Sequence, residues 1–119
     1  MDKNYGSVEA CQRLFKAGIA LETDFYWARG NNGWYLRSYE YYDREVLESI
    51  PAPSMAEVWR ELPEGIEVNG SWAPLFVNKI GCGASVGYRI EHHIIIHFSN
   101  ENPTDALIDL LIWVRKEKV

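Results

Sequence analysis

Three histidines lie close together in the pattern His-His-x-x-x-His, from His92 to His97. Histidine is the commonest imidazole ligand for metal ions, so this pattern is the first to test for metal chemistry. The run Ile94-Ile95-Ile96 between them is β-branched throughout, which favours a strand. On a strand, residues four apart are separated by about 13 Å, whereas two imidazole nitrogens bound to one ion each lie about 2 Å from it. We therefore interpret the histidines as residues of a solvated strand face and expect no metal.

Cys82 lies in a glycine-rich stretch that resembles a phosphate-binding loop, Gly81-Cys82-Gly83-Ala84-Ser85-Val86-Gly87. A dinucleotide-binding loop must open a helix whose N-terminus meets the pyrophosphate, but this stretch precedes a segment typical of a strand. We interpret it as a hairpin connection and expect no cofactor. Catalysis by the Cys82 thiol would need a base such as His93 within hydrogen-bond reach. A small enzyme or small-ligand binder with a pocket near Cys82 and the histidines is an alternative to the preferred interpretation, a non-enzymatic protein.

Aromatic residues are dense between positions 26 and 42. They are Tyr26, Trp27, Trp34, Tyr35, Tyr39, Tyr41 and Tyr42. If residues 34–42 form one strand, alternate residues share a side, and these are Tyr35, Arg37, Tyr39 and Tyr41. Tyrosine with arginine is the composition enriched at the energetic centres of protein interfaces, so we predict a protein-binding surface there. The alternative is packing of the rings in the core and across strands.

Two carboxylates, Asp105 and Asp109, are spaced four residues apart in a segment with an apolar helical pattern. This spacing places both on one face of a helix. Paired carboxylates can perform acid and base catalysis, but a polar stripe toward solvent, with Asp105 near the helix N-terminus, explains them without catalysis. We predict no catalytic residue at this position.

The 17 acidic residues outnumber the 12 basic ones, which gives a formal net charge of −5. This balance argues against binding nucleic acid through direct phosphate contacts. The same charge leaves an acidic mimic of DNA as a further alternative. The longest apolar stretch, Ala106 to Val114, is about half the length of roughly 20 residues that a membrane helix needs. With no apolar leader visible after Met1, we expect a cytoplasmic protein with no membrane contact and with both cysteines, Cys11 and Cys82, reduced.

Caps and periodicities predict the elements that position these residues. A helix should begin after the N-cap Ser7 and end at Gly18. The segments 19–28 and 34–42 favour strands joined by the turn 30–33. A capping box of Ser54 and Glu57 predicts a short helix. Strands are then expected at 75–80, 86–90 and 92–98, before a buried helix whose N-cap is Asn102.

The order α-β-β-α-β-β-β-α predicts a single α+β domain over residues 1–119. We expect an antiparallel sheet of about five strands, with about three helices packed mainly on one face. No internal repeat or linker divides the chain.

Three stretches carry a family resemblance. They are CQRLFKAGI (11–19) running into TDFYW (23–27), PAPSMAEV (51–58) and NPTDALIDLLIW (102–113). Their order resembles that of small uncharacterised proteins associated with prophages and other mobile elements of Bacteroides-type bacteria. The resemblance implies an accessory or host-interaction protein that acts by binding. From the residues we expect the partner to be another protein, and a homodimer is a further possibility. The matching motifs are caps and core residues, so the resemblance identifies a scaffold and no catalytic residue.

Overall fold

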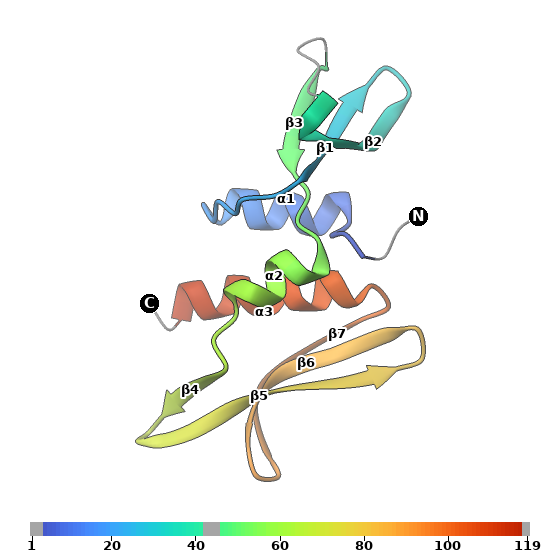
Figure 1. Cartoon of the computed structure of the whole chain (residues 1–119). Coiled ribbons are helices and arrows are strands. Elements are labelled where there is room, and N and C mark those ends of the chain that lie inside the picture. Colours follow the sequence, from blue (N-terminus) through green and yellow to red (C-terminus); the bar gives the residue numbers. More distant parts are fainter. Residues whose placement is uncertain (1–3, 42–45, 118–119) are drawn as a thin grey trace.

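Each of the three helices begins at a side-chain cap that the sequence predicts. The computed structural model describes residues 4–41 and 46–117 (Figure 1). The helices in these ranges are α1 (Val8–Lys16), α2 (Met55–Glu61) and α3 (Pro103–Glu117). The Ser7 hydroxyl accepts a hydrogen bond from α1, Ser54 and Glu57 form the capping box of α2, and the Asn102 side chain accepts two N–H groups of α3. These bonds satisfy backbone donors that have no partner inside a helix, so they fix where each helix begins.

The strands of the described ranges form two antiparallel sheets. The first sheet has the order β2-β1-β3 and contains β1 (Phe25–Gly30), β2 (Gly33–Ser38) and β3 (Glu48–Pro51). The second has the order β4-β5-β6-β7 and contains β4 (Gly65–Val68), β5 (Ser71–Ile80), β6 (Gly83–Ile90) and β7 (His93–Asn100). A 3-10 turn, η1 (Tyr39–Tyr41), follows β2.

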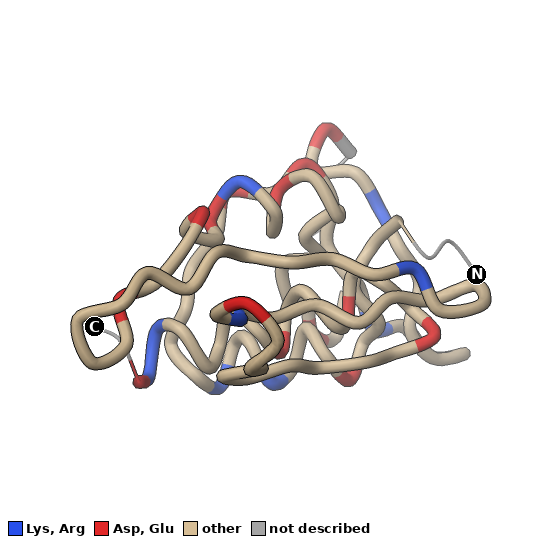
Figure 2. Tube along the Cα trace, turned by 90° about the horizontal axis from the view of Figure 1, so that it is seen from below, with Lys and Arg blue, Asp and Glu red and all other residues tan. Residues whose placement is uncertain are grey.

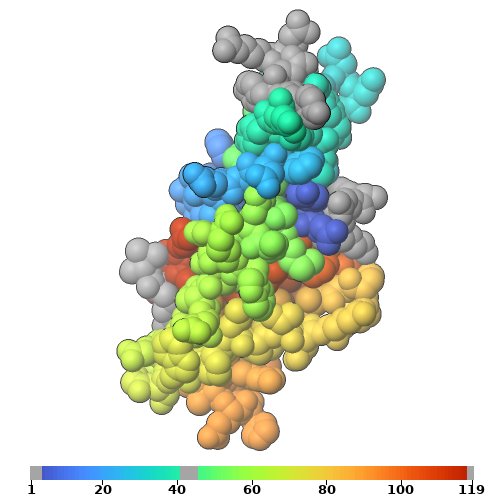
Figure 3. Space-filling view, in the orientation of Figure 1, coloured from blue at the N-terminus to red at the C-terminus, as the bar shows by residue number. Residues whose placement is uncertain are grey.

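The helices form a layer between the two sheets (Figure 1). Helix α3 lies at the centre of this layer, where it packs against α1, α2, β6 and β7. Its buried apolar residues are Ala106, Leu107, Ile108, Leu110, Leu111 and Val114. The space-filling view shows the first sheet at one end of the molecule and the second at the other (Figure 3). The burial of α3 therefore holds most of the elements together, because burying apolar surface is the main favourable term in folding.

Tyr88 on β6 is the largest side chain that the second sheet buries completely. Its hydroxyl donates a hydrogen bond to the Pro63 carbonyl at 2.8 Å. Burial penalises the phenolate and raises the pKa of Tyr88 to about 12. The bond joins β6 to the segment that leaves α2.

Asp105 ties the N-terminal segment to α3. Its side chain is only 6% exposed, and its Oδ1 accepts the Ser7 N–H at 2.7 Å. The predicted solvent stripe of Asp105 and Asp109 is therefore wrong for Asp105, because residues 6 and 7 pack over the first turn of α3. Asp109 is half-buried and accepts two bonds from Arg13, at 2.9 and 3.1 Å.

The predicted α+β fold class is confirmed, and the strands differ from the prediction in their number and arrangement. We expected about five strands in one sheet with helices mainly on one face, whereas the structure has sheets of three and four strands with the helices between them. The sequence pattern does not predict β3 and β4. Each has only four residues, and β3 ends in Pro51 while β4 begins at Gly65. Proline and glycine are depleted in strands, so these elements give little signal.

Two predicted strands are shorter than expected. The segment 19–28 alternates, but pairing begins only at Phe25, because Ile19 and Leu21 pack on the core from an irregular segment without a partner strand. The predicted strand 34–42 ends at Ser38. There the Asp24 carbonyl accepts the Tyr39 N–H at 3.0 Å, while the Asp24 N–H donates to Glu57 at 3.1 Å. The first bond continues the β1–β2 register by one pair, and the backbone then turns into η1, which ends the strand.

Candidate functional site

The outer face of the first sheet carries part of the predicted tyrosine surface. Residues directly opposite each other in an antiparallel pair share a face. Tyr35 lies opposite Ala28, and Arg37 lies opposite Tyr26. The next residue of β1, Trp27, points to the other face and belongs to the core that the helices share. Tyr35 and Arg37 therefore face away from the helices.

Tyr39 lies beside these two residues. It lies in the 3-10 turn η1, whereas the sequence predicted it on the strand. Its ring lies against the Tyr26 ring, with 4.7 Å between centroids and 37° between planes. Tyr26 is fully buried by this arrangement, whereas Tyr39 and Tyr35 each stay 39% exposed. Tyr41 also lies in the turn η1 and not on β2, and its side chain is outside the described part of the structure. We call Tyr35, Arg37 and Tyr39 the β2 surface.

The rings of the β2 surface are held by their neighbours before any partner is present. A Cβ atom added at Gly30 would lie 3.3 Å from the Tyr35 ring, so this ring covers the glycine across the strand pair. Tyr39 is fixed by its backbone bond to Asp24 and by its ring contact with Tyr26. Rings that are already ordered lose little rotamer freedom on binding, which favours affinity.

Strand β2 is also an edge of its sheet. The order β2-β1-β3 leaves one side of β2 without a neighbouring strand among the described residues. Edge strands are commonly protected by proline, lysine or a bulge, because an open edge can pair with another chain. Strand β2 reads Gly-Trp-Tyr-Leu-Arg-Ser and contains no proline or lysine. Its one charged side chain is Arg37, so the edge carries little of this protection.

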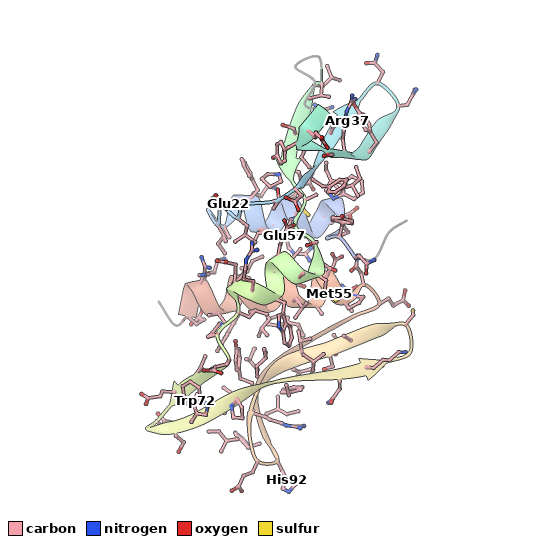
Figure 4. The ribbon with its side chains drawn as sticks, viewed as in Figure 1. Glu22, Arg37, Met55, Glu57, Trp72 and His92 are labelled. Carbon is pink, nitrogen blue, oxygen red and sulfur yellow. The ribbon has the colours of Figure 1, made fainter. Side chains whose placement is uncertain are left out.

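The structure does not bring Cys82 and the histidines together. Cys82 is exposed in the turn between β5 and β6, and His92 lies in the turn between β6 and β7, at the lower end of Figure 4. Strand β6 separates the two turns by roughly 23 Å. His97 lies opposite Gly87, about 13 Å along β6 from Gly83. No histidine is thus placed to act as a base for Cys82.

None of the histidines lies in a metal-binding cluster within the described ranges. His92, His93 and His97 are all exposed, and among the described residues no group of three His, Cys, Asp or Glu side chains could hold an ion. Five surface hollows of the same ranges are lined by residues other than Cys82 and the histidines.

Cys11 is a core residue and not a reactive thiol. It is 1% exposed, and burial, with a smaller contribution from the Asp105 carboxylate, raises its pKa to about 12. A thiol acts as a nucleophile only as the thiolate, which this environment disfavours. Cys11 and Cys82, the two cysteines of the chain, do not form a disulfide with each other.

Acidic and basic positions are interspersed over the molecule, as the tube in Figure 2 shows. Among the described helices, none combines the length and the apolar character that crossing a bilayer requires.

Sequence reasoning missed one further feature, a hollow where the last turns of α1 and α3 meet β7. Its lining includes Lys16, Phe98, Trp113 and Lys116. The available signal was the pair of basic residues that ends each helix, Arg13 with Lys16 and Arg115 with Lys116. These ends meet only because α1 and α3 pack in parallel, and the sequence does not show that packing.

No protein-family model, curated protein or solved structure matches this chain.

Proposed function

We propose that this chain is an accessory protein of a phage or mobile element that acts in the cytoplasm by binding another protein through the β2 surface. The observation that carries the proposal is the combination of two half-exposed tyrosines and an arginine with a strand edge that has no neighbouring strand in the described part of the chain. Tyrosine and arginine are enriched among the residues that contribute most binding energy, and an open edge supplies main-chain hydrogen bonds.

The partner segment is expected to bind as an added strand. Its backbone would pair with β2, while its side chains would contact Tyr35 and Arg37 on the outer face. Glu40 is exposed beside Tyr39 in the sequence, so Arg37 and Glu40 offer both charges to a partner. The resemblance to prophage-associated proteins supports a partner from the host or from the same element.

The test compares three forms of the purified protein in cross-linking capture from a lysate of a Bacteroides-type host. They are the wild type, the variant Tyr35→Ala, Arg37→Ala, Tyr39→Ala, and the control Trp72→Ala. Trp72 is 56% exposed and belongs to the second sheet, so it is a matched exposed aromatic far from β2. We expect a partner that the wild type and the control retain and that the triple variant loses.

Binding of the identified partner is then measured by calorimetry with the three single variants. A residue at an energetic centre costs about 2 kcal/mol or more on truncation, so we expect the affinity of at least one single variant to fall about 30-fold. Equal affinity of the triple variant and the wild type, with circular dichroism confirming that both are folded, would contradict the proposal.

A second copy of the chain is the competing occupant of the β2 edge. Sedimentation of the wild type over a range of micromolar concentrations distinguishes self-association from binding of a different protein. A dimer that the variant Tyr35→Lys dissociates would assign the surface to self-association, because a lysine on an edge strand opposes pairing.

A further inference from the structure

Helices α1 and α3 run side by side in the same direction. Near their beginnings the Ser7 N–H donates to Asp105 at 2.7 Å, and further along Arg13 donates to Asp109 at 2.9 Å. Their last turns therefore come together, next to Phe98 of β7. The junction leaves a surface hollow of about 430 Å³, which we call the α1–α3 hollow.

The floor of the α1–α3 hollow is apolar. Phe98, Ile112 and Trp113 line it, and all three are half-buried against the core. Each of these side chains packs on the core and also borders the hollow. A preformed concave site with an apolar lining and a volume of roughly 300–1,000 Å³ is typical of small-molecule binding.

The rim of the hollow is positively charged on a chain whose net charge is −5. Lys16 and Lys116 contribute exposed ammonium groups, and neither has an ion-pair partner among the described residues. Arg13 and Asp109, which also line the hollow, pair with each other. The two lysines are therefore the charges left for a ligand.

We propose that the α1–α3 hollow binds a small aromatic carboxylate. The ring would lie on Phe98, Ile112 and Trp113, and the carboxylate would lie between the ammonium groups of Lys16 and Lys116. An inorganic anion alone would leave the apolar floor exposed to water, and a neutral ring would leave the two lysines without a partner. The hollow shares no residue with the β2 surface, so this inference does not depend on the proposed function.

The test uses two fluorescent probes of similar shape, 8-anilinonaphthalene-1-sulfonate and its uncharged analogue N-phenyl-1-naphthylamine. The sulfonate probe should bind the wild type at one site, and 1-naphthoate should displace it while 1-naphthalenemethanol does not. In the double variant Lys16→Gln, Lys116→Gln, affinity for the sulfonate probe should fall about fivefold to tenfold, because two exposed charge contacts are lost. The affinity for the uncharged analogue should stay within twofold.

The matched control is Lys79→Gln, which removes an exposed lysine from β5 and should leave both probes unaffected. The triple variant of the β2 surface should also bind the sulfonate probe as the wild type does. Equal affinity of the wild type and the double lysine variant for the sulfonate probe would overturn the proposal. So would displacement by the alcohol as effective as displacement by the carboxylate.

Discussion

At the scale of single residues, the pKa values of the buried groups are shifted mainly by burial and not by charge pairing. The two groups whose pKa is raised most, Cys11 and Tyr88, are both buried, and burial is the main cause for each. Each prefers its neutral form in the folded protein. Their titration is therefore linked to the stability of the fold.

This linkage predicts a loss of stability at alkaline pH. The pKa of Cys11 is raised from 9.0 and that of Tyr88 from 10.0, each to about 12. Between these values the unfolded chain releases protons that the folded protein retains, so the free energy of unfolding falls as pH rises from about 9 to about 12. Thermal unfolding followed by circular dichroism across this range measures the effect.

The variant Tyr88→Phe separates the contribution of the phenol. It should lower the free energy of unfolding at pH 7 by about 1 kcal/mol, because the Pro63 carbonyl loses its hydrogen bond. Its stability should decline less steeply than that of the wild type between pH 10 and 12. If the free energy of unfolding falls equally steeply with pH in the two proteins, the Tyr88 phenol does not cause the loss of stability at alkaline pH.

At the scale of elements, the helix caps and the hairpin turns were predictable from the sequence, whereas the ends of the strands and their division into two sheets were not. Ser7, Ser54 with Glu57, and Asn102 act within a few residues of their own positions, so the local sequence contains the whole signal. Strand β2 ends where the turn η1 begins, at Tyr39. The aromatic residues of 34–42 favour a strand throughout, so the predicted strand wrongly included Tyr39.

The same distinction applies to the candidate sites. The exposure of Tyr35 and the outward direction of Arg37 follow from the alternation of β2, which the sequence contains. The α1–α3 hollow depends on how two helices about 95 residues apart pack together. Only the fold brings their basic ends to one place.

Strands β6 and β7 approach each other closely at two glycines. A Cβ atom at Gly83 would meet the backbone of Asn100, and one at Gly87 would meet the Ile96 carbonyl. We expect Gly87→Ala to destabilise the protein by about 1–3 kcal/mol, as overpacking of a close contact does. Ser85→Ala, on the same strand, is the control and should cost less. Urea unfolding of both variants checks this, and equal midpoints would contradict it.

At the scale of the whole molecule, the layer of helices makes the protein elongated. Its extents are 51 × 32 × 20 Å, and its radius of gyration of 15.4 Å exceeds the value of about 13.5 Å for a compact chain of this length. Arg37 and His92 lie near opposite ends in Figure 4. The two sheets share no edge and are connected through the helices.

This architecture predicts that damage to α3 affects both ends of the molecule. Leu111 is fully buried, so Leu111→Ala should lower the free energy of unfolding by about 2–5 kcal/mol. Hydrogen exchange followed by mass spectrometry should show faster exchange in β1 and β2 as well as in β6 and β7. Faster exchange confined to the second sheet would mean that the first sheet folds independently of α3. The exposed variant Lys116→Ala is the control.

The position of α3 at the end of the described chain also affects biosynthesis. Strands β1 to β7 leave the ribosome before residues 103–117, against which α1, α2, β6 and β7 pack. At roughly 5–20 residues per second, translation from the end of β1 to the end of α3 takes about 4–17 s. During that time the nascent chain carries apolar strands whose covering helix does not yet exist. The nascent chain should therefore be a substrate for chaperones that shield apolar segments, and the completed fold should not.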